Sequence, residues 1–350
     1  MNLLPGVEAG TLDTDRLRTH YYSSGPANGT PVVMIHGNLS TGRFYEHLWP
    51  GAPEQYRFIA PDMRSFGRSQ SKPIDATRGL HDWADDTRAL LEAIGVNEPP
   101  HLVGWSTGGA AIAAYAMDRP VASLTFIDPV SPYGYGGTHR DGTPCQPDWA
   151  GTGGGTGNPE FTSLLASGDR SADSQVSPRN VMTSSYWSSE YTLPADREEI
   201  LLDEVLLTVT GDDGYPGDLT PSDHWPNVAP GTRGILNALS GKYCNWAGVV
   251  DMADKPPVLW THGSNDIVVA DGSLWEMGSL GQMGIIPGWP GEDSFPPQPM
   301  VSQIRDVLDR YADNGGRVEV EMFDGSGHGP HIDAAERWSE RFFDFLASTN

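Results

Sequence analysis

Residues 99–118 read PPHLVGWSTGGAAIAAYAMD, and their pattern gives the first indication of the fold. A short apolar run ends in GWSTG at residues 104–108, and an alanine-rich segment with high helix propensity begins directly after it. The five residues therefore lie on a predicted turn between a strand and a helix. This is the context that the nucleophile motif G-x-S-x-G requires.

The two glycines of this motif have a steric role. A tight turn that pushes the Ser106 hydroxyl outward at the end of a strand leaves no room for a Cβ atom at Gly104 or Gly108. We therefore predict that Ser106 is a nucleophile. A G-x-S-x-G pattern by itself is common by chance, so the rest of the chain has to support the prediction.

The chain before and after the motif alternates predicted strands with helices. Strands are expected at residues 19–24, 31–35, 58–60 and 123–130, and a helix is expected at 80–94. This alternation predicts an α/β fold with a mostly parallel, doubly wound sheet that helices cover on both faces.

The same pattern resumes near the C-terminus. The sheet is expected to continue at residues 256–266, followed by a helix at 302–312, a strand at 318–323 and a closing helix at 334–346. Residues 273–299 carry many apolar side chains without a helical period. We expect them to pack against other segments, because a loop of that length would otherwise be hard to justify.

Residues 131–250 interrupt the alternation and are predicted to form a helical, loop-rich cap. The best helix in this insertion is expected at 196–209. The segment 151–157 (GTGGGTG) is predicted to be a mobile lid loop over Ser106, because its glycines offer few side-chain contacts. The expected organisation is a core of residues 1–130 and 251–350 with the cap 131–250 inserted into it.

The overall charge excludes some classes of partner. The 350 residues include 22 Lys and Arg against 46 Asp and Glu, which gives a formal net charge of −24. Nucleic acids and anionic membrane surfaces bind basic patches, so we expect neither as a partner. The charge says nothing about catalysis.

Cysteine usage and the N-terminal sequence indicate a cytoplasmic location. The two cysteines, Cys145 and Cys244, are too few for a disulfide framework or a zinc cluster, and we expect free thiols, with one bridge across the insertion left open. The start of the chain lacks the basic and apolar regions of a signal peptide, and no apolar run reaches membrane-spanning length. The sequence leaves open whether the chain forms a homodimer.

A nucleophilic serine needs a base and an acid that orients the base. His328 follows the last predicted strand in a glycine-flanked turn, and Asp266 follows the preceding strand in the segment GSND. Their order, Ser106, Asp266, His328, is the one expected when the serine lies on a strand-to-helix turn.

Five segments together resemble the α/β-hydrolase fold superfamily. The resemblance covers residues 19–130 and 255–348 and leaves the predicted cap without a signature. Ser65 departs from the pattern, because a glycine usually occupies its position. The five segments are HGN at 36–38, DMRSFGRS at 62–69, GWSTG at 104–108, GSND at 263–266 and GHGPH at 327–331.

The resemblance implies roles for further residues. It implies that the backbone N–H groups of Asn38 and Thr107 form the oxyanion hole and that His36 orients the loop before it. The turn that carries the nucleophile, GWSTG at 104–108, is called the nucleophile elbow. Some members of the superfamily place the acid after the strand that follows the helix of this elbow, where this chain has Asp128. We favour Asp266 as the acid and keep Asp128 as the alternative.

Two aromatic side chains flank the expected oxyanion donors. Trp105 and Phe44 are candidates for lining the substrate pocket, with core packing as the equally weighted alternative. The other histidines, including His262, show no metal-ligand spacing, and no metal or cofactor is predicted.

The resemblance and the serine together predict the reaction. A serine at the elbow argues against haloalkane dehalogenase and epoxide hydrolase chemistry, which need a carboxylate nucleophile. We therefore expect a serine hydrolase that cleaves a small, apolar carboxylic ester or lactone. The alternatives are a C–C bond hydrolase acting on a diketone-type substrate and a hydrolase-derived ligand-binding protein.

Overall fold

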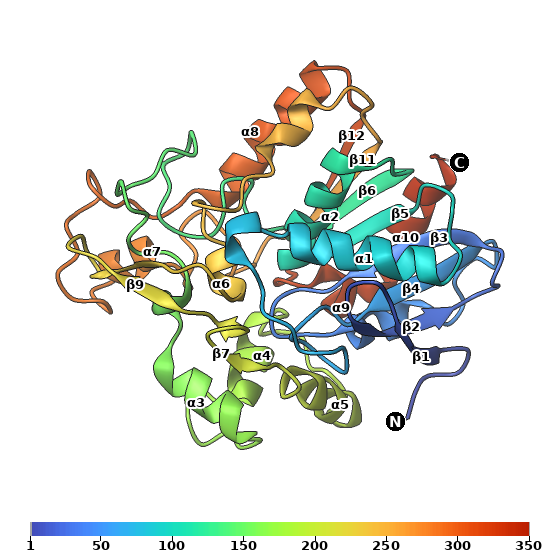
Figure 1. The fold of residues 1–350 in the computed structure, drawn as a ribbon, viewed down its shortest axis with the longest axis horizontal. Coiled ribbons are helices and arrows are strands. Elements are labelled where there is room, and N and C mark those ends of the chain that lie inside the picture. The colour runs from blue at the N-terminus through green and yellow to red at the C-terminus, as the bar shows by residue number, and fades with distance from the viewer. Residues whose placement is uncertain (1, 350) are drawn as a thin grey trace.

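A computed structural model describes residues 2–349 and places an eight-stranded sheet at the centre of this part of the chain (Figure 1). The strand order is β1-β2-β4-β3-β5-β6-β11-β12, in which β1, β2 and β4 pair antiparallel and all the other neighbours pair parallel. The predicted α/β class with a mostly parallel sheet is confirmed. The strands of this sheet are β1 Glu8–Asp13, β2 Arg18–Ser24, β3 Thr30–Ile35, β4 Tyr56–Pro61, β5 His101–Trp105, β6 Ser123–Ile127, β11 Val258–Gly263 and β12 Val318–Phe323.

Helices cover both faces of the sheet. In β11, Trp260 lies under the guanidinium of Arg305 on α8, 5.1 Å from the ring centre, while the neighbouring Thr261 accepts a hydrogen bond from Trp338 on α10. Consecutive strand residues point to opposite faces, so α8 and α10 lie on opposite faces. The helices are α1 His81–Ala93, α2 Thr107–Asp118, α3 Pro159–Ser167, α4 Pro178–Ser185, α5 Ala195–Val205, α6 Ile235–Ala238, α7 Met277–Gln282, α8 Met300–Asp313, α9 Pro330–Asp333 and α10 Ala335–Ala347.

The inner parallel strands are buried along their whole length. Every residue of β5, β6 and β11 is buried. Burial on both faces explains why these strands appear in the sequence as short continuous apolar runs. The edge strand β1 was not predicted, because its sequence EAGTLD lacks such a run and most of its residues are exposed.

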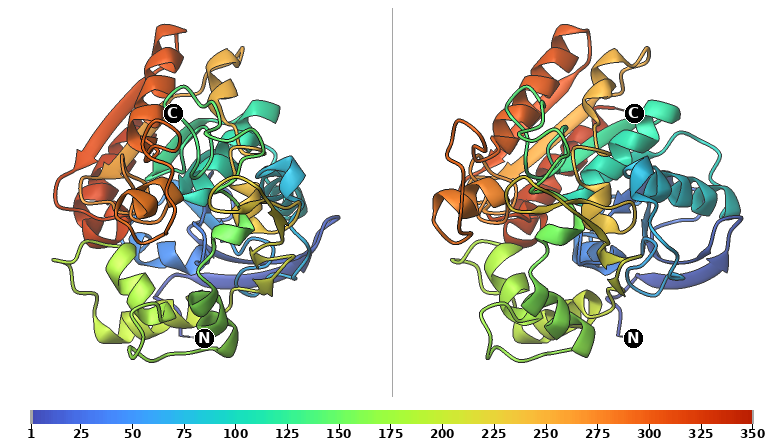
Figure 2. Two further views of the ribbon diagram at one scale, coloured as in Figure 1. Left: turned by 90° about the vertical axis from the view of Figure 1, so that its left-hand side faces the viewer. Right: turned by 60° about the vertical axis from the view of Figure 1, so that its left-hand side comes forward.

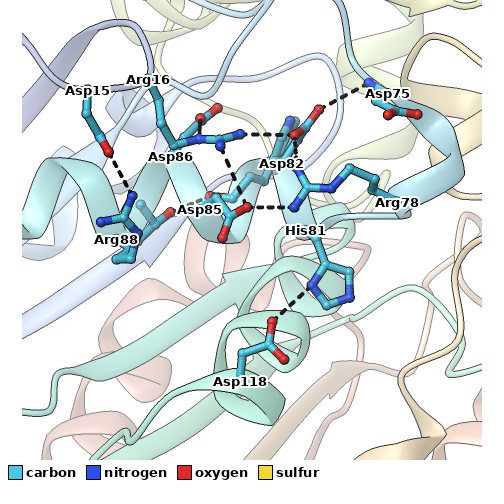
Figure 3. Close-up of polar contacts among 12 residues, drawn as sticks. Asp15, Arg16, Asp75, Arg78, His81, Asp82, Asp85, Asp86, Arg88 and Asp118 are labelled. Atoms are coloured by element: carbon cyan, nitrogen blue, oxygen red, sulfur yellow. Dashed lines mark hydrogen bonds and ion pairs between the residues drawn. The ribbon is translucent and has the colours of Figure 1, made fainter.

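A cluster of arginines and aspartates holds helix α1 on the core (Figure 3). Arg16 lies 3.0 Å from Asp82 and 2.6 Å from Asp86. Arg64 joins the same two carboxylates at 2.8 and 2.6 Å. Because Arg64 belongs to the loop 62–69, the cluster fixes this loop to α1.

The loop 62–69 has a left-handed backbone conformation at Ser65, the position that glycine usually occupies in the α/β-hydrolase pattern. Ser65 has φ +66°. Its hydroxyl donates a hydrogen bond of 2.9 Å to the carbonyl oxygen of Lys72. The Ser65 departure therefore leaves the turn in place, at the steric cost that a side chain adds to a left-handed conformation.

The insertion between β6 and β11 contains helices α3 to α6, of which α3, α4 and α5 gather at one end of the molecule and α6 lies nearer its centre (Figures 1 and 2). The carboxylate of Glu204 on α5 is fully buried and accepts hydrogen bonds from Thr41 at 2.9 Å and from Arg68 at 2.7 Å. Arg197 on the same helix pairs with Glu46 of the core. These buried ion pairs attach α5 to the sheet domain. The short strands of the insertion are β7 Thr210–Gly211, β8 Tyr215–Pro216, β9 Leu219–Pro221 and β10 Val228–Pro230, and the 3-10 helices of the chain are η1 Gly42–Leu48, η2 Ala76–Arg78, η3 Gly154–Thr156 and η4 Ala247–Asp251.

The glycine-rich segment 151–157 was predicted to be a mobile lid loop, but the structure shows a packed segment. Its first four residues are buried. The N–H of Gly151 donates to Val228 O at 2.9 Å, and that of Gly154 donates to Asn237 Oδ1 at 2.8 Å. Glycines fit here because neighbouring atoms lie close: a Cβ would lie 2.5 Å from the Phe295 ring at Gly151 and 2.4 Å from Asp218 O at Gly154. Tight packing and hydrogen bonds from its N–H groups therefore hold the segment in place.

Replacing Gly153 by alanine is expected to destabilise the fold. A Cβ there would lie 2.3 Å from Asn237 Oδ1, at a φ of +82°. Backbone strain of about 1–2 kcal/mol and overpacking of about 1–3 kcal/mol add up. In urea unfolding, Gly168→Ala is the matched control, because Gly168 has φ +71° and nothing within 4 Å of the added Cβ. Equal losses of unfolding free energy in the two variants would contradict a packed segment.

Residues 273–299 were expected to pack against other segments, and only some of their apolar side chains do so. Phe295 is fully buried, with its ring centre 5.0 Å from that of Trp225 in the insertion. Met283 and Ile285 are 48% and 61% exposed. Residues 273–299 therefore contact the insertion on one side and solvent on the other.

Two sequence expectations concern the chain as a whole. Cys145 and Cys244 are free, so no disulfide crosses the insertion. Within residues 2–349, none of the helices combines the length and the apolarity that crossing a bilayer needs.

Candidate active site

The turn between β5 and α2 carries Ser106 in a strained conformation, with φ 54° and ψ −116°. Its N–H donates to Ile127 O at 2.9 Å, and its carbonyl accepts from Val130 N at 3.1 Å. Residues held in such sparsely populated conformations cost about 1–3 kcal/mol and persist only where their surroundings determine them. The hydrogen bonds to the end of β6 provide that support.

Close packing explains the glycines beside Ser106. A Cβ at Gly104 would lie 2.3 Å from Gly108 O, and a Cβ at Gly108 would lie 2.1 Å from Ile35 O. The third glycine nearby, Gly37, would bring a Cβ within 3.1 Å of the Ser106 Cβ. The backbone approach that the motif predicts is therefore present, and the loop 36–38 runs directly beside Ser106.

His328 and Asp266 meet in a buried hydrogen bond. His328 Nδ1 lies 2.8 Å from Asp266 Oδ2, and both side chains are buried. The other carboxylate oxygen, Oδ1, accepts from the N–H groups of Val268 at 2.7 Å and Val269 at 3.1 Å. The carboxylate is thus fully engaged, and it holds one imidazole nitrogen of His328.

A further hydrogen bond ties His328 to the turn that carries Ser106. Trp105 Nε1 donates to the carbonyl oxygen of His328 at 2.7 Å. The two ring centres are 5.7 Å apart. Because Trp105 directly precedes Ser106, the histidine loop is fixed next to the predicted nucleophile.

Electrostatics favour an ionised Asp266. Burial by itself would raise the pKa of this carboxyl, but the charge and hydrogen bond of His328, together with the hydrogen bond from Val268 N, outweigh burial and hold the pKa below its usual value. A carboxylate in this state can orient the imidazole and stabilise its protonated form.

Asp128 contacts Gly263 and His262 and makes no hydrogen bond to His328. Its Oδ1 accepts a hydrogen bond of 2.8 Å from Gly263 N and lies 3.6 Å from His262 Nδ1. Burial first, and then the charge of Asp266, raise the pKa of Asp128 well above its usual value. Of the two candidate acids, the hydrogen bond to His328 belongs to Asp266.

The loop 36–38 has the features of an oxyanion loop. His36 accepts a hydrogen bond at Nε2 from Met63 N (3.0 Å), so its Nδ1 carries the proton and donates to Gly37 O at 2.7 Å. Burial lowers the pKa of His36 to about 4, which keeps the ring neutral. Within residues 2–349, the N–H groups of Asn38 and Thr107 donate to no turn, loop or cap acceptor. These are the two N–H groups that the sequence analysis expects to form the oxyanion hole.

Sequence reasoning missed the contribution of Tyr186. Its hydroxyl donates to Leu39 O at 2.9 Å, and its ring centre lies 5.4 Å from that of Trp105. The residue comes from the insertion, about 80 positions after the elbow, so no local pattern connects it to the loop it supports.

The two proposed pocket residues are buried. Trp105 and Phe44 are 1% and 0% exposed, and their ring centres lie 5.6 Å apart. In this structure they form the packed wall under the elbow. Trp105 holds the carbonyl of His328, and Phe44 packs against Trp105 and Tyr186.

One group of side chains in residues 2–349 could share a metal ion. Ligand atoms of Asp128, His262 and Asp266 all lie within 4.8 Å of one another. An ion there would compete with His328 for Asp266, since His328 already binds Asp266 Oδ2.

The chain matches a known protein family. The profile of the alpha/beta hydrolase family matches residues 32–341. A haloalkane dehalogenase of Mycobacterium marinum is 33% identical over 129 residues, which are 35% of this chain and 43% of that protein. A cis-3-alkyl-4-alkyloxetan-2-one decarboxylase of Xanthomonas campestris is 38% identical over 28% of this chain and 35% of its own. The chain thus matches less than half the length of these curated relatives.

Solved structures resemble the chain over nearly its whole length. The esterase RhEst1 from Rhodococcus sp. ECU1013 has a TM-score of 0.58 at 18% identity, over 99% of this chain and 100% of its own. The epoxide hydrolase CorEH has a TM-score of 0.62 at 17% identity, over 98% and 100%. At these identities the likeness concerns the fold.

Proposed function

Because the chain belongs to the alpha/beta hydrolase family, we propose that it is a serine hydrolase that cleaves a carboxylic ester or lactone. The observation that carries the proposal is the 2.8 Å hydrogen bond between His328 and buried Asp266, held beside the Ser106 turn by Trp105. A base oriented by a carboxylate next to a strained serine is the arrangement that activates a hydroxyl nucleophile.

In the proposed reaction, Ser106 Oγ attacks the carbonyl carbon of the substrate while its proton passes to His328 Nε2. The negative charge that develops on the carbonyl oxygen is stabilised by the N–H groups of Asn38 and Thr107. The protonated imidazole then gives its proton to the alcohol oxygen, the C–O bond breaks, and an acyl group remains on Ser106. Water repeats the sequence and releases the acid.

The choice of an ester or lactone rests on the nucleophile. The dehalogenase and epoxide hydrolase among the related proteins would need a carboxylate to form an alkyl-enzyme ester, and this chain has a serine at that position. An acyl-enzyme is the intermediate that a serine forms. The relative from Xanthomonas campestris is named for an oxetan-2-one, which is a cyclic ester. This supports lactones as a subclass to test.

Residues 131–250 act as a cap in this proposal. The backbone of the insertion approaches the histidine loop so closely that a Cβ at Gly327 would lie 2.4 Å from the carbonyl carbon of Trp187. Asp333 accepts from Gly327 N at 2.8 Å and from Ser188 N at 2.9 Å, and so joins the two segments. Such a cover excludes water and selects substrates.

Covalent labelling tests the proposal. A small fluorophosphonate should label Ser106 and no other serine, as read by peptide mass spectrometry, and Ser106→Ala should abolish the label. A panel of p-nitrophenyl esters, lactones and β-diketones then separates the reaction classes. Label on a different serine, or stoichiometric ligand retention without turnover, would contradict the proposed hydrolase.

A further inference from the structure

A second buried carboxyl group lies directly behind the Asp266–His328 pair. Asp128 follows β6, is 0% exposed, and has φ +40°. One of its oxygens, a ring nitrogen of His262 and an oxygen of Asp266 all lie within 4.8 Å of one another. Two carboxyl groups at this distance, both out of water, cannot both be ionised without a compensating charge.

His262 does not supply that charge. Its Nε2 lies 2.9 Å from the carbonyl oxygen of Val269, so Nε2 carries a proton and donates it. The other nitrogen, Nδ1, has no hydrogen-bond partner. Burial lowers the pKa of His262, more than the neighbouring Asp266 raises it. The ring is therefore neutral.

The hydrogen bonds of the two carboxyl groups are unequal. Both oxygens of Asp266 accept hydrogen bonds, from His328 and from two backbone N–H groups. Asp128 Oδ1 accepts from Gly263 N, but Asp128 Oδ2 has no donor. A buried carboxylate oxygen without a donor is strongly unfavourable, whereas a protonated one becomes a donor itself.

The other charges around Asp128 point the same way. Asp266 on the loop after β11 and Asp333 on α9 both disfavour its ionised form. His262 on β11 is neutral, and His328 on the loop after β12 directs Nδ1 to Asp266. Burial and these carboxylates raise the pKa of Asp128 well above its usual value, in agreement with the missing donor.

We propose that Asp128 is a positioning residue for the catalytic acid: its carboxyl group is neutral and donates a hydrogen bond from Oδ2 to the carboxylate of Asp266. The inference rests on the proposed function, in which Asp266 orients His328. The pair of carboxyl groups then holds a single negative charge, located on the residue that contacts the base.

The pH dependence of two variants tests this role. Asp128→Asn keeps the acceptor for Gly263 N and offers an N–H donor to Asp266, so kcat for p-nitrophenyl acetate should stay within about threefold of wild type. The acidic limb of its pH–kcat profile should stay within about 0.3 pH units. Asp128→Leu removes the donor, so the more basic Asp266 should hold the His328 proton more tightly. Its acidic limb should move up by roughly one pH unit.

An ionised Asp128 predicts the opposite sign. Its negative charge would stabilise the protonated imidazole of His328, so both variants would move the acidic limb to lower pH, and that result would overturn the proposal. The fluorophosphonate label on Ser106 separates the two hypotheses: an unlabelled Ser106 contradicts the hydrolase, whereas a labelled enzyme with the wrong shift contradicts only the role of Asp128.

Infrared difference spectroscopy reads the proton without turnover. At about pH 8.5, wild type minus Asp128→Asn should show the carbonyl stretch of a protonated carboxylic acid. Asp62→Asn is the control, because burial raises the pKa of Asp62 to about 7 and that carboxyl is mostly ionised at this pH. No band in the Asp128 difference, or a stoichiometric divalent cation that Asp128→Asn releases, would show that something other than a proton balances the charge.

Discussion

Replacing Ser106 by alanine is expected to lower kcat by about 10⁴- to 10⁶-fold, the size of loss that removal of a nucleophile from such a unit causes. The variant loses one oxygen atom from a partly exposed side chain, so no core volume disappears. The His328–Asp266 hydrogen bond and the N–H groups of Asn38 and Thr107 remain. Substrate binding and the melting temperature should therefore change little.

The matched control is Ser184→Ala, which removes an exposed serine hydroxyl in the insertion. Its kcat should equal that of wild type. If Ser106→Ala keeps more than a tenth of wild-type turnover with an ester that wild type hydrolyses, the serine mechanism is wrong.

Replacing Asp266 by asparagine is expected to lower kcat by about 10⁴-fold. The neutral amide carries no negative charge to stabilise the imidazolium of His328 that forms during the reaction. It also no longer ensures that Nδ1 of the neutral imidazole carries the proton. The pKa of Asp266 is already held low by His328. The loss should therefore persist at every pH at which the wild-type enzyme is active, as pH–kcat profiles would reveal.

The comparison with Asp128→Asn decides between the two candidate acids. Asp128 bonds to Gly263 and faces His262, whereas Asp266 holds His328. We expect the Asp266 variant to be far slower than the Asp128 variant. If Asp128→Asn is the crippled enzyme, the roles are reversed and the inference about a neutral Asp128 fails with them.

Elements whose signal is local could be predicted from consecutive residues alone. The turn at Ser106 could be predicted because strand, glycines and helix are consecutive. The contact that requires Gly104 lies within that stretch, whereas the one that requires Gly108 is with Ile35 on β3. The buried parallel strands could be predicted because burial on both faces makes each one a continuous apolar run.

Which distant groups touch depends on how the elements pack together. Asp128 and Asp266 follow neighbouring strands and both have plausible local sequences, and it is the chain's path after β11 that brings Asp266 within 2.8 Å of His328. The glycine-rich segment 151–157 was misread as mobile because its hydrogen-bond partners, Val228 and Asn237, lie about 80 residues away. Contacts across such separations depend on how whole elements pack, and a single sequence contains no local pattern that records them.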